Sequence, residues 1–216
     1  FRSWDNLIPE LADQYELIIH DLPGSGASLA IADMSLEGMA TALISILPKD
    51  PIAVVGHSMG GYIALAMLEK YPERLNSLAL FHSTSYADSE EKKASRRKGI
   101  EFIQQRGPFE FLKTTIPNLF SPLSRQHMPE KVREVIDQQQ NSLAPSLIAY
   151  YEAMMARPDR RQLLKNCQIP VLFLLGKYDV AVPFHDGMEQ SRLPEISYLA
   201  LLDRKSTRLN SSHANI

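Results

Sequence analysis

The chain has 216 residues, 44% of them hydrophobic and 22% charged, which is enough to bury a substantial core and excludes a disordered protein. Its net charge of −2 and its dispersed basic residues argue against a nucleic-acid-binding protein. No apolar stretch approaches the ~20 residues of a membrane span, and the single cysteine, Cys167, fits a reducing compartment. We therefore expect a cytoplasmic protein that binds neither membrane nor nucleic acid.

Strand and helix patterns alternate along the chain. Strands are predicted at residues 16–20, 52–56, 75–81, 170–176 and 196–202, and helices at residues 35–47 and 59–71. Such alternation predicts an α/β fold with a mostly parallel sheet and helices on both faces.

A long segment between the third and fourth predicted strands contains no convincing strand. Helices are predicted there at residues 88–106, 108–115, 129–141 and 144–156. Its basic cluster is interleaved with glutamates, which is typical of a solvated helix face; it comprises Lys92, Lys93, Arg96, Arg97 and Lys98. Its large apolar residues could pack the segment or line an acyl pocket; they are Phe102, Phe109, Phe111, Leu112, Phe120, Tyr150, Tyr151 and Met154.

The sequence Gly-His-Ser-Met-Gly at residues 56–60 follows a β-branched run and precedes a helical pattern. A serine at such a strand-to-helix corner is exposed on a strained turn, and we expect Gly56 and Gly60 to make room for the close approach of strand and helix. The N–H of Met59, at the start of the helix, can stabilise an oxyanion. The motif predicts a nucleophile elbow centred on Ser58.

These features resemble the α/β-hydrolase superfamily, and the resemblance extends to about Leu202. Residues 1–28 are similar to the first helix, next strand and Asp-x-x-Gly-x-Gly-x-Ser turn of the family, with Ser25 where many members carry histidine. PVLFLLGKYDVAVP, at residues 170–183, resembles the late strand and the loop that presents the acid of the triad, which would be Asp179. The nearest likeness is to small bacterial carboxylesterases and lactonases.

The resemblance implies a domain organisation as well as an activity. Residues 1–82 and 158–202 would form the hydrolase core, and residues 83–157 a helical lid. A serine hydrolase would cleave a small carboxylic ester, lactone or thioester through an acyl-enzyme at Ser58, without a cofactor or a metal.

The two ends of the chain depart from the family. The strand and His-Gly loop that donate a second oxyanion N–H would lie before Phe1, and DRKSTRLNSSHANI, at residues 203–216, corresponds to the translation of a common sequencing-library adapter. We interpret that segment as a non-native tail. His213, which lies within it, is then not the catalytic base, although a histidine after Asp179 in the chain fits the order found in the family. We expect the true base to follow Leu202 in the native protein. Without that base, the 216-residue chain is expected to have a kcat lower by a factor on the order of 10⁶.

The other histidines have alternative interpretations. His57 is expected to be structural, and His20 precedes Asp21, which with Gly24 and Gly26 is expected to shape a loop near the pocket. His127 and His185 lie in polar stretches and are expected at the surface. No spacing of histidines, cysteines and carboxylates predicts a metal site.

His82, Ser83 and Asp179 leave two alternatives open. His82 and Ser83 follow a predicted strand, so they could line the ligand crevice or serve only local hydrogen bonds. Asp179 could be the triad acid or an ordinary turn former that bonds its own backbone.

Three functions compete. The first is the ester hydrolase; the second keeps the fold but performs C–C hydrolysis, perhydrolase or haloperoxidase chemistry, or a lyase reaction; the third is a noncatalytic hydrolase-like binding protein. Ser58 argues against haloalkane dehalogenases and epoxide hydrolases, whose nucleophile is aspartate. The expected partner is a small ester-like molecule, and the sequence does not determine the oligomeric state.

Overall fold

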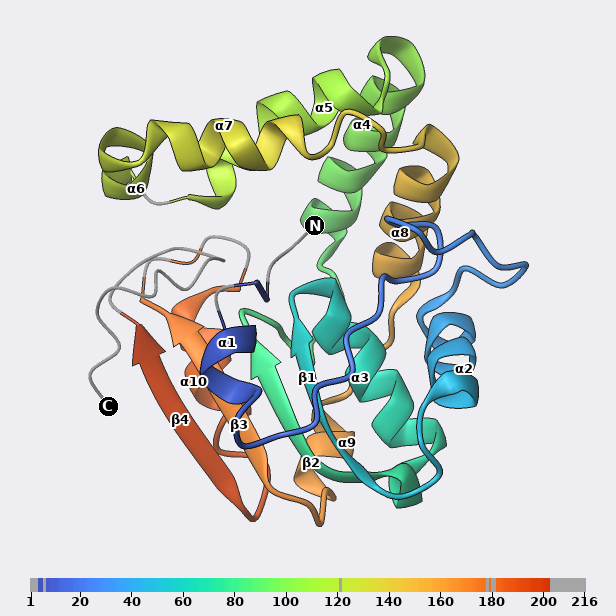
Figure 1. Cartoon of the computed structure of the whole chain (residues 1–216), viewed down its shortest axis with the longest axis vertical. Coiled ribbons are helices and arrows are strands. Elements are labelled where there is room, and N and C mark those ends of the chain that lie inside the picture. Colours follow the sequence, from blue (N-terminus) through green and yellow to red (C-terminus); the bar gives the residue numbers. More distant parts are fainter. Residues whose placement is uncertain (1–3, 6, 121, 178, 180–181, 203–216) are drawn as a thin grey trace.

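Four parallel strands form the centre of the molecule in the computed structural model (Figure 1), which describes the chain except residues 1–3, 6, 121, 178, 180–181 and 203–216. The sheet order is β1-β2-β3-β4. The strands are β1 (Ile52–His57), β2 (Leu75–Phe81), β3 (Val171–Gly176) and β4 (Ser197–Leu202). All four strands were predicted from the sequence to within one residue at each end, because each is a short apolar run bounded by turn residues.

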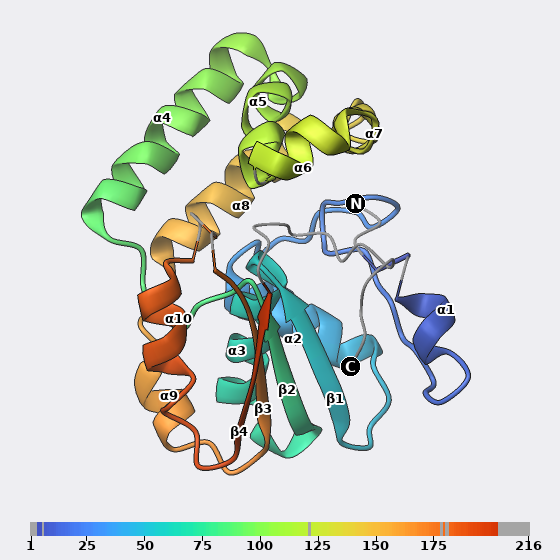
Figure 2. The same ribbon diagram turned by 90° about the vertical axis from the view of Figure 1, so that its left-hand side faces the viewer.

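Helices cover both faces of this sheet. The helices α3 (Met59–Lys70), α9 (Arg161–Lys165) and α10 (Phe184–Gln190) lie on one side, and the short α1 (Ile8–Leu11) lies on the other (Figure 2). α2 (Leu36–Ile46) packs on α3 and begins at Ser35, whose Oγ accepts a hydrogen bond from the Gly38 N–H at 3.0 Å. A 3-10 turn, η1 (Pro72–Arg74), links α3 to β2. The α/β architecture predicted from the alternating pattern is therefore confirmed.

The main core lies between α3 and the sheet. Eight consecutive residues of α3, from Gly61 to Leu68, are buried, so this helix is apolar on every side as expected of a central helix. From β2 and β3 the side chains of Leu78, Leu80 and Phe173 meet it, and Phe173 is fully buried. This packing holds the amino end of α3 against the carboxyl end of β1.

The strand predicted at residues 16–20 is absent, and this part of the prediction was wrong. Residues 16–20 have no regular secondary structure, and Ile18 and Ile19 are 41% and 49% exposed. Among the described residues β1 pairs only with β2. A strand is stabilised by its ladder partner, so a β-favouring sequence without one remains irregular.

Helices fill the chain between β2 and α9. They are α4 (Glu90–Arg106), α5 (Pro108–Thr115), the 3-10 turn η2 (Ile116–Leu119), α6 (Pro122–His127), α7 (Pro129–Asp137) and α8 (Ala144–Ala156). Figure 2 shows α4 to α8 grouped beyond the carboxyl ends of the strands. Four of these helices were predicted; α6, α9 and α10 were not, because each has seven residues or fewer and too few turns to show a helical period.

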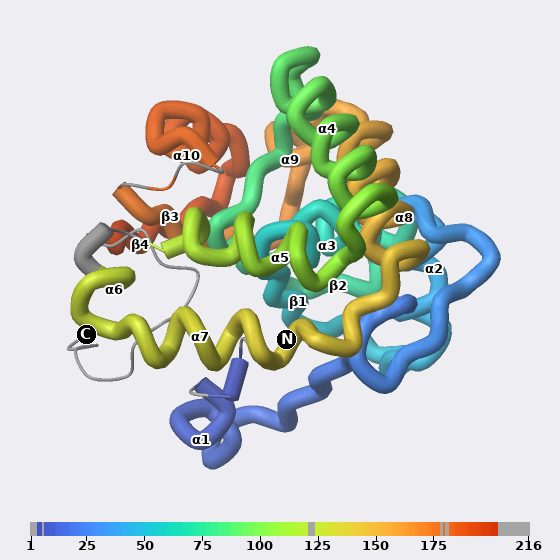
Figure 3. The backbone as a smooth tube through the Cα atoms, turned by 90° about the horizontal axis from the view of Figure 1, so that it is seen from above, coloured from blue at the N-terminus to red at the C-terminus, as the bar shows by residue number. Residues whose placement is uncertain are grey.

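A second, smaller core joins α5, η2 and α7; Figure 3 shows α5 and α7 running in roughly the same direction, and η2 contacts both of them. Ile116, Phe120, Val132 and Val135 are its buried members. Elsewhere in the segment, the Phe111 ring lies 5.5 Å from the Tyr151 ring and 5.9 Å from the Phe102 ring. These aromatic residues therefore pack the segment, as the first of the two alternatives predicted.

A buried ion-pair group joins α4 to the end of α8. The Asp88 side chain is fully buried, and its Oδ2 accepts a hydrogen bond from Arg96 Nε at 2.6 Å. Arg157 Nη2 lies 2.8 Å from Asp88 Oδ1 but out of line for a hydrogen bond, so this contact is an ion pair. Arg96 is thus partly buried, which corrects the prediction that all five basic residues of α4 form a solvated face.

A tyrosine links α8 to the loop after the first helix. Tyr150 Oη donates a hydrogen bond to the Pro23 carbonyl at 2.6 Å. Desolvation is the main reason why the pKa of Tyr150 is raised to about 12, so the phenol keeps its proton and donates this bond at neutral pH.

In the part of the chain that the structure describes, no helix has both the length and the apolar character needed to cross a bilayer.

Candidate active site

Ser58 sits at a sharp corner between β1 and α3. Its φ of 52° and ψ of −118° lie in a region that L-residues rarely adopt. The corner is held from both sides: the Ser58 N–H donates to the Phe81 carbonyl at 2.9 Å, and the Gly61 N–H donates to the Ser58 carbonyl at 2.9 Å. The surrounding structure thus imposes a strained backbone on a serine at a helix start, as the motif predicted.

The glycines of this corner differ in what they do. A Cβ on Gly56 would lie 2.5 Å from Gly61 Cα and 2.6 Å from the Gly60 carbonyl oxygen, whereas a Cβ on Gly60 would meet nothing within 4 Å. A Cβ on Gly61 would lie 2.5 Å from Ser83 Cβ. The close approach therefore needs Gly56 and Gly61, which corrects the expectation that Gly60 makes the room.

Met59 is the first residue of α3. The first N–H groups of a helix have no partner within the helix, and no described residue accepts a hydrogen bond from the Met59 N–H. This N–H, next to Ser58, is in a position to donate to an oxyanion formed there.

Asp179 follows β3 and is almost buried, with 8% of its side chain exposed. Its Oδ1 accepts a hydrogen bond from the Val182 N–H at 3.1 Å, and its Oδ2 lies 2.9 Å from His82 Nδ1. The contact with Val182 is typical of an aspartate that forms a turn. The contact with His82 joins Asp179 to the end of β2, the strand beside β3 in the sheet. Val180 and Ala181, which belong to the motif used to select Asp179, lie outside the described residues.

His82 is the residue directly after β2, and it has a positive φ of 46°. Its N–H donates to the Leu174 carbonyl of β3 at 3.0 Å, and its side chain is 6% exposed. Because His57 pairs with Phe81 in the register of β1 and β2, the next residues, Ser58 and His82, follow at neighbouring strand ends. The structure thus brings the three predicted residues Ser58, His82 and Asp179 to one edge of the sheet, although no hydrogen bond joins Ser58 Oγ to a histidine among the described residues.

Ser83 lies beneath the serine corner. It is fully buried, and its Oγ donates to the Ser58 carbonyl at 2.9 Å, which is the local hydrogen-bonding alternative.

Gln190, on α10, was not singled out from the sequence. Its Nε2 donates to the Ser83 carbonyl at 2.9 Å and its Oε1 accepts from the Ser85 N–H at 2.8 Å, so it fixes the loop after His82. A lone glutamine in a short helix carries no sequence signal for this role, which comes from a contact 107 residues away.

His57 has a packing role, as predicted. Its ring contacts the rings of Trp4 and His82 edge to face, with centroids 6.3 Å and 6.1 Å apart. Its Nε2 is buried with no hydrogen-bond partner among the described residues. Burial, reinforced by the neighbouring His82, lowers the pKa of His57 from 6.5 to about 4, so the ring is neutral at pH 7.

The remaining predicted residues are peripheral. Asp21 shapes its loop as expected: its Oδ2 accepts from the Ala27 N–H at 3.0 Å, and Gly24 and Gly26 have positive φ. His20, His127 and His185 are exposed. Within the described residues, no group of three or more histidines, cysteines or carboxylates is arranged to hold a metal ion.

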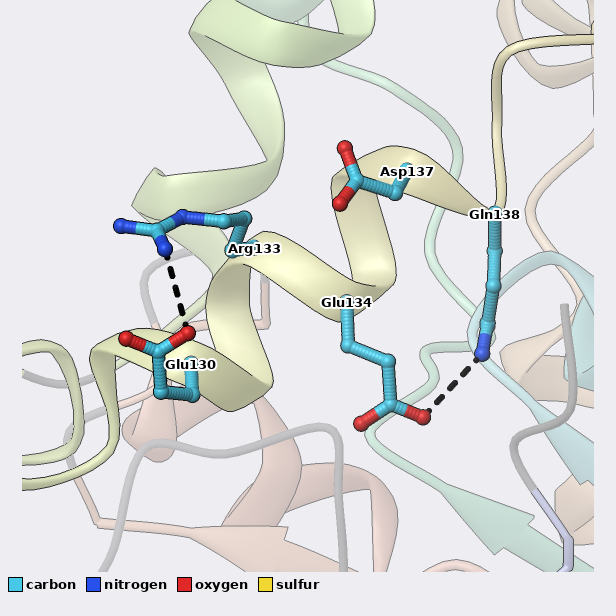
Figure 4. Close-up of a pocket in the computed structure, with 5 residues that line it drawn as sticks. All are labelled: Glu130, Arg133, Glu134, Asp137 and Gln138. Atoms are coloured by element: carbon cyan, nitrogen blue, oxygen red, sulfur yellow. Dashed lines mark hydrogen bonds and ion pairs between the residues drawn. The ribbon is translucent and has the colours of Figure 1, made fainter.

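A hollow of about 410 Å³ lies along α7, away from the predicted site residues. Five polar or charged side chains line it, four from α7 and one from the residue that follows this helix: Glu130, Arg133, Glu134, Asp137 and Gln138 (Figure 4). Two exposed contacts run between them, Arg133 to Glu130 at 3.2 Å and Gln138 to Glu134 at 3.3 Å. The residues that line this surface are all polar or charged, and none of them belongs to the groups described above.

Comparison with known proteins agrees with this geometry. Residues 1–202 match the family described as the alpha/beta hydrolase fold. Over 200 residues the chain is 30% identical to a pimeloyl-[acyl-carrier protein] methyl ester esterase of Methylococcus capsulatus, covering 88% of the chain and 76% of the relative. The chain therefore belongs to the alpha/beta hydrolase fold family.

Solved structures give the same result. A thermophilic esterase from Thermogutta terrifontis superposes with a TM-score of 0.86 at 29% identity, covering 94% of this chain and 76% of that one. An enol-lactonase from Burkholderia xenovorans superposes with a TM-score of 0.84 at 20% identity, covering 95% and 79%, which supports the fold alone. The family match, the esterase relative and the thermophilic esterase together support an ester-hydrolysing serine hydrolase.

Proposed function

We propose that Ser58 is the nucleophile of this hydrolase and forms an acyl-enzyme with its substrate. The observation that carries the proposal is the strained corner at Ser58, with φ of 52° at the first turn of α3. Ser58 Oγ would attack the substrate carbonyl, and the Met59 N–H would donate to the oxyanion. The mechanism uses side chains and backbone alone.

Asp179 is the proposed acid of the triad. A carboxylate oxygen has two lone pairs, so Oδ1 and Oδ2 can each accept a further hydrogen bond beyond those from Val182 and His82. A histidine following β4 would complete the triad as general base, with its Nδ1–H donating to Asp179 and its Nε2 accepting the Ser58 proton. His213 lies outside the described residues.

The helices between β2 and α9 are proposed to form a cap over this site, with residues 83–157 as the cap and residues 1–82 and 158–202 as the hydrolase core. Their position beyond the carboxyl ends of the strands, where Ser58 and Asp179 emerge, supports this division (Figure 2).

The proposed substrates are small carboxylic esters, lactones or thioesters. Methyl esters of carboxylic acids come first among them, because the relative from Methylococcus capsulatus is named for a methyl ester. A panel that also contains C–C bond substrates and peracid formation separates the alternative chemistries on the same fold.

The test begins with the source DNA, sequenced across the codon for Leu202. We expect the adapter-like codons to be absent there and a histidine codon to follow β4. If residues 203–216 prove to be encoded, the interpretation as an adapter is wrong, and His213 becomes the base to mutate.

The product of that complete reading frame is then assayed with the ester panel and a fluorophosphonate probe, beside its Ser58→Ala variant. We expect labelling at Ser58 and a loss on the order of 10⁶ in kcat in the variant. An unlabelled Ser58, or hydrolysis that survives Ser58→Ala, would overturn the proposed mechanism and favour a noncatalytic binding protein or a different nucleophile.

A further inference from the structure

We propose that His82 is a positioning residue that holds the carboxylate of Asp179 through a hydrogen bond from its Nδ1–H. The inference rests on the proposed role of Asp179 as triad acid. In this role His82 neither lines the pocket nor serves only a local hydrogen bond. It fixes the orientation of a catalytic side chain.

The contact between the two residues is short and shielded. His82 Nδ1 lies 2.9 Å from Asp179 Oδ2, and the two side chains are only 6% and 8% exposed. A carboxylate has no proton to donate at neutral pH, so the hydrogen bond requires the proton to be on Nδ1. A charge-assisted hydrogen bond in a site shielded from water restricts the carboxylate more strongly than a solvated one.

The histidine is itself held in place from three directions. Its N–H donates to the Leu174 carbonyl, so its backbone is tied to β3, the strand that leads to Asp179. The His57 ring contacts its ring at 6.1 Å in an edge-to-face arrangement. Gln190 and Ser83 fix the chain directly after it, and Ser83 also bonds the Ser58 carbonyl.

The backbone of His82 adds an independent observation. A φ of 46° is uncommon for a residue with a side chain, although histidine, like asparagine and aspartate, adopts it more often than most, and such conformations persist where the surroundings stabilise them. Here it occurs at a strand end that also carries the contact to Asp179. Ser58 and His82, at neighbouring strand ends, are the two described non-glycine residues with positive φ.

The carboxylate of Asp179 is therefore held by two hydrogen bonds, one at each oxygen. The Val182 N–H bonds Oδ1 and the His82 Nδ1–H bonds Oδ2, so rotation of the carboxylate is blocked at both oxygens. A catalytic base that donates a hydrogen bond to Asp179 would therefore find the carboxylate in a fixed orientation. Misplacement of a catalytic group by about 1 Å can lower the rate by about 10²-fold, which is the scale of effect expected when one support is lost.

The test uses a matched pair of variants in the product of the complete reading frame, His82→Asn and His82→Gly. Both residues tolerate positive φ, so neither variant forces the backbone, but only asparagine supplies an N–H donor near the position of Nδ1. We expect kcat to fall by about 10²-fold in His82→Gly with a smaller change in KM, and to stay within roughly tenfold of wild type in His82→Asn. Equal loss in both variants, or no loss in His82→Gly, would overturn the proposal.

A second measurement does not depend on turnover or on variants of His82. In the 216-residue chain labelled with ¹⁵N-histidine, two-bond nitrogen–proton correlations at pH 8 report which ring nitrogen of His82 carries the proton. We expect the proton on Nδ1 and a change in its signal in Asp179→Asn. A bare Nδ1 would refute the proposed hydrogen bond.

Ser58→Ala separates the two proposals. If that variant still hydrolyses the ester, the proposed function fails whatever His82 does. If Ser58→Ala is inactive and His82→Gly is unimpaired, the inference about His82 fails alone.

Discussion

Ser58 has a backbone that glycine would adopt more readily. Its φ of 52° costs of order 1–3 kcal/mol for a residue with a Cβ, while glycine pays roughly 0.4–1 kcal/mol more entropy on folding. We therefore expect Ser58→Gly to be more stable than Ser58→Ala by about 1 kcal/mol in urea unfolding. Both variants lack the hydroxyl, so the difference between them reports the backbone conformation alone. Equal urea midpoints for the two variants would show that the corner stores no backbone strain.

His57 gives a residue-scale prediction about pH. Its pKa is lowered from 6.5 to about 4 by burial, so the unfolded chain binds the proton more tightly than the folded one. The stability that His57 contributes is present above pH 6.5 and is lost as the pH falls towards 4, by at most about 3 kcal/mol. Urea unfolding of wild type and His57→Gln between pH 7 and pH 4 measures the difference. If the two proteins lose stability in parallel, His57 is not the titrating group.

At the scale of elements, the corner between β1 and α3 depends on one close approach. A Cβ on Gly56 would lie 2.5 Å from Gly61 Cα, a backbone atom that cannot move aside alone. We expect Gly56→Ala to lose about 1–3 kcal/mol or more in thermal unfolding. Gly60→Ala is the control, since its Cβ would meet nothing within 4 Å, and a helical alanine there is expected to be neutral or stabilising by up to about 1 kcal/mol. A similar loss in both variants would contradict the assignment.

The junction between α4 and α8 depends on Asp88. Arg157 is 3% exposed, lies 2.8 Å from Asp88 Oδ1 and donates to the Tyr86 carbonyl at 2.9 Å. Removing Arg157 leaves the buried carboxylate of Asp88 with one fewer positive partner. We therefore expect Arg157→Met to lower the free energy of unfolding by about 3–5 kcal/mol. The exposed Arg97→Met, on the same helix as Arg96, is expected to stay within about 0.5 kcal/mol.

The double variant Asp88→Leu/Arg157→Met checks the cause of that cost. It removes the stranded carboxylate together with Arg157. Arg96 also loses its partner but is 20% exposed and can be hydrated, so the double variant should be less destabilised than Arg157→Met alone. Additive losses would show that Arg157 acts through its packing on the Tyr62 ring, 4.1 Å away, and not through the ion pair.

At the scale of the whole molecule, the family match and the last strand of the sheet end at the same residue. Residues 1–202 match the family, and the match ends at the last residue of β4. If residues 203–216 are adapter-derived, a chain ending at Leu202 should unfold within about 0.5 kcal/mol of the 216-residue chain. A chain ending at Ile196 is the control: it lacks β4, whose six residues pair with β3, and it should be strongly destabilised. Clear destabilisation of the chain ending at Leu202 would count against the adapter interpretation.

Much of this architecture could be read from local patterns. Each strand of the sheet is a short apolar run, and the elbow is a short motif in which Gly56 and Ser58 contact Gly61, only a few residues away. The failures were of two kinds. Helices such as α6 and α10 are too short to show a period, and residues 16–20 have a strand-like sequence that only a ladder partner could stabilise.

The four strands of the parallel sheet and the position of Ser58 could be predicted from the sequence, because these features depend on residues close together in the chain. The contact of His82 with Asp179, 97 residues later, and the role of Gln190 in holding the loop after His82 became visible in the folded structure alone. Those contacts arise from the order of β1, β2 and β3 in the sheet, which brings distant strand ends together. Local periodicity carries no record of which strand ends become neighbours, so the partners of a catalytic group appear only once the sheet is assembled.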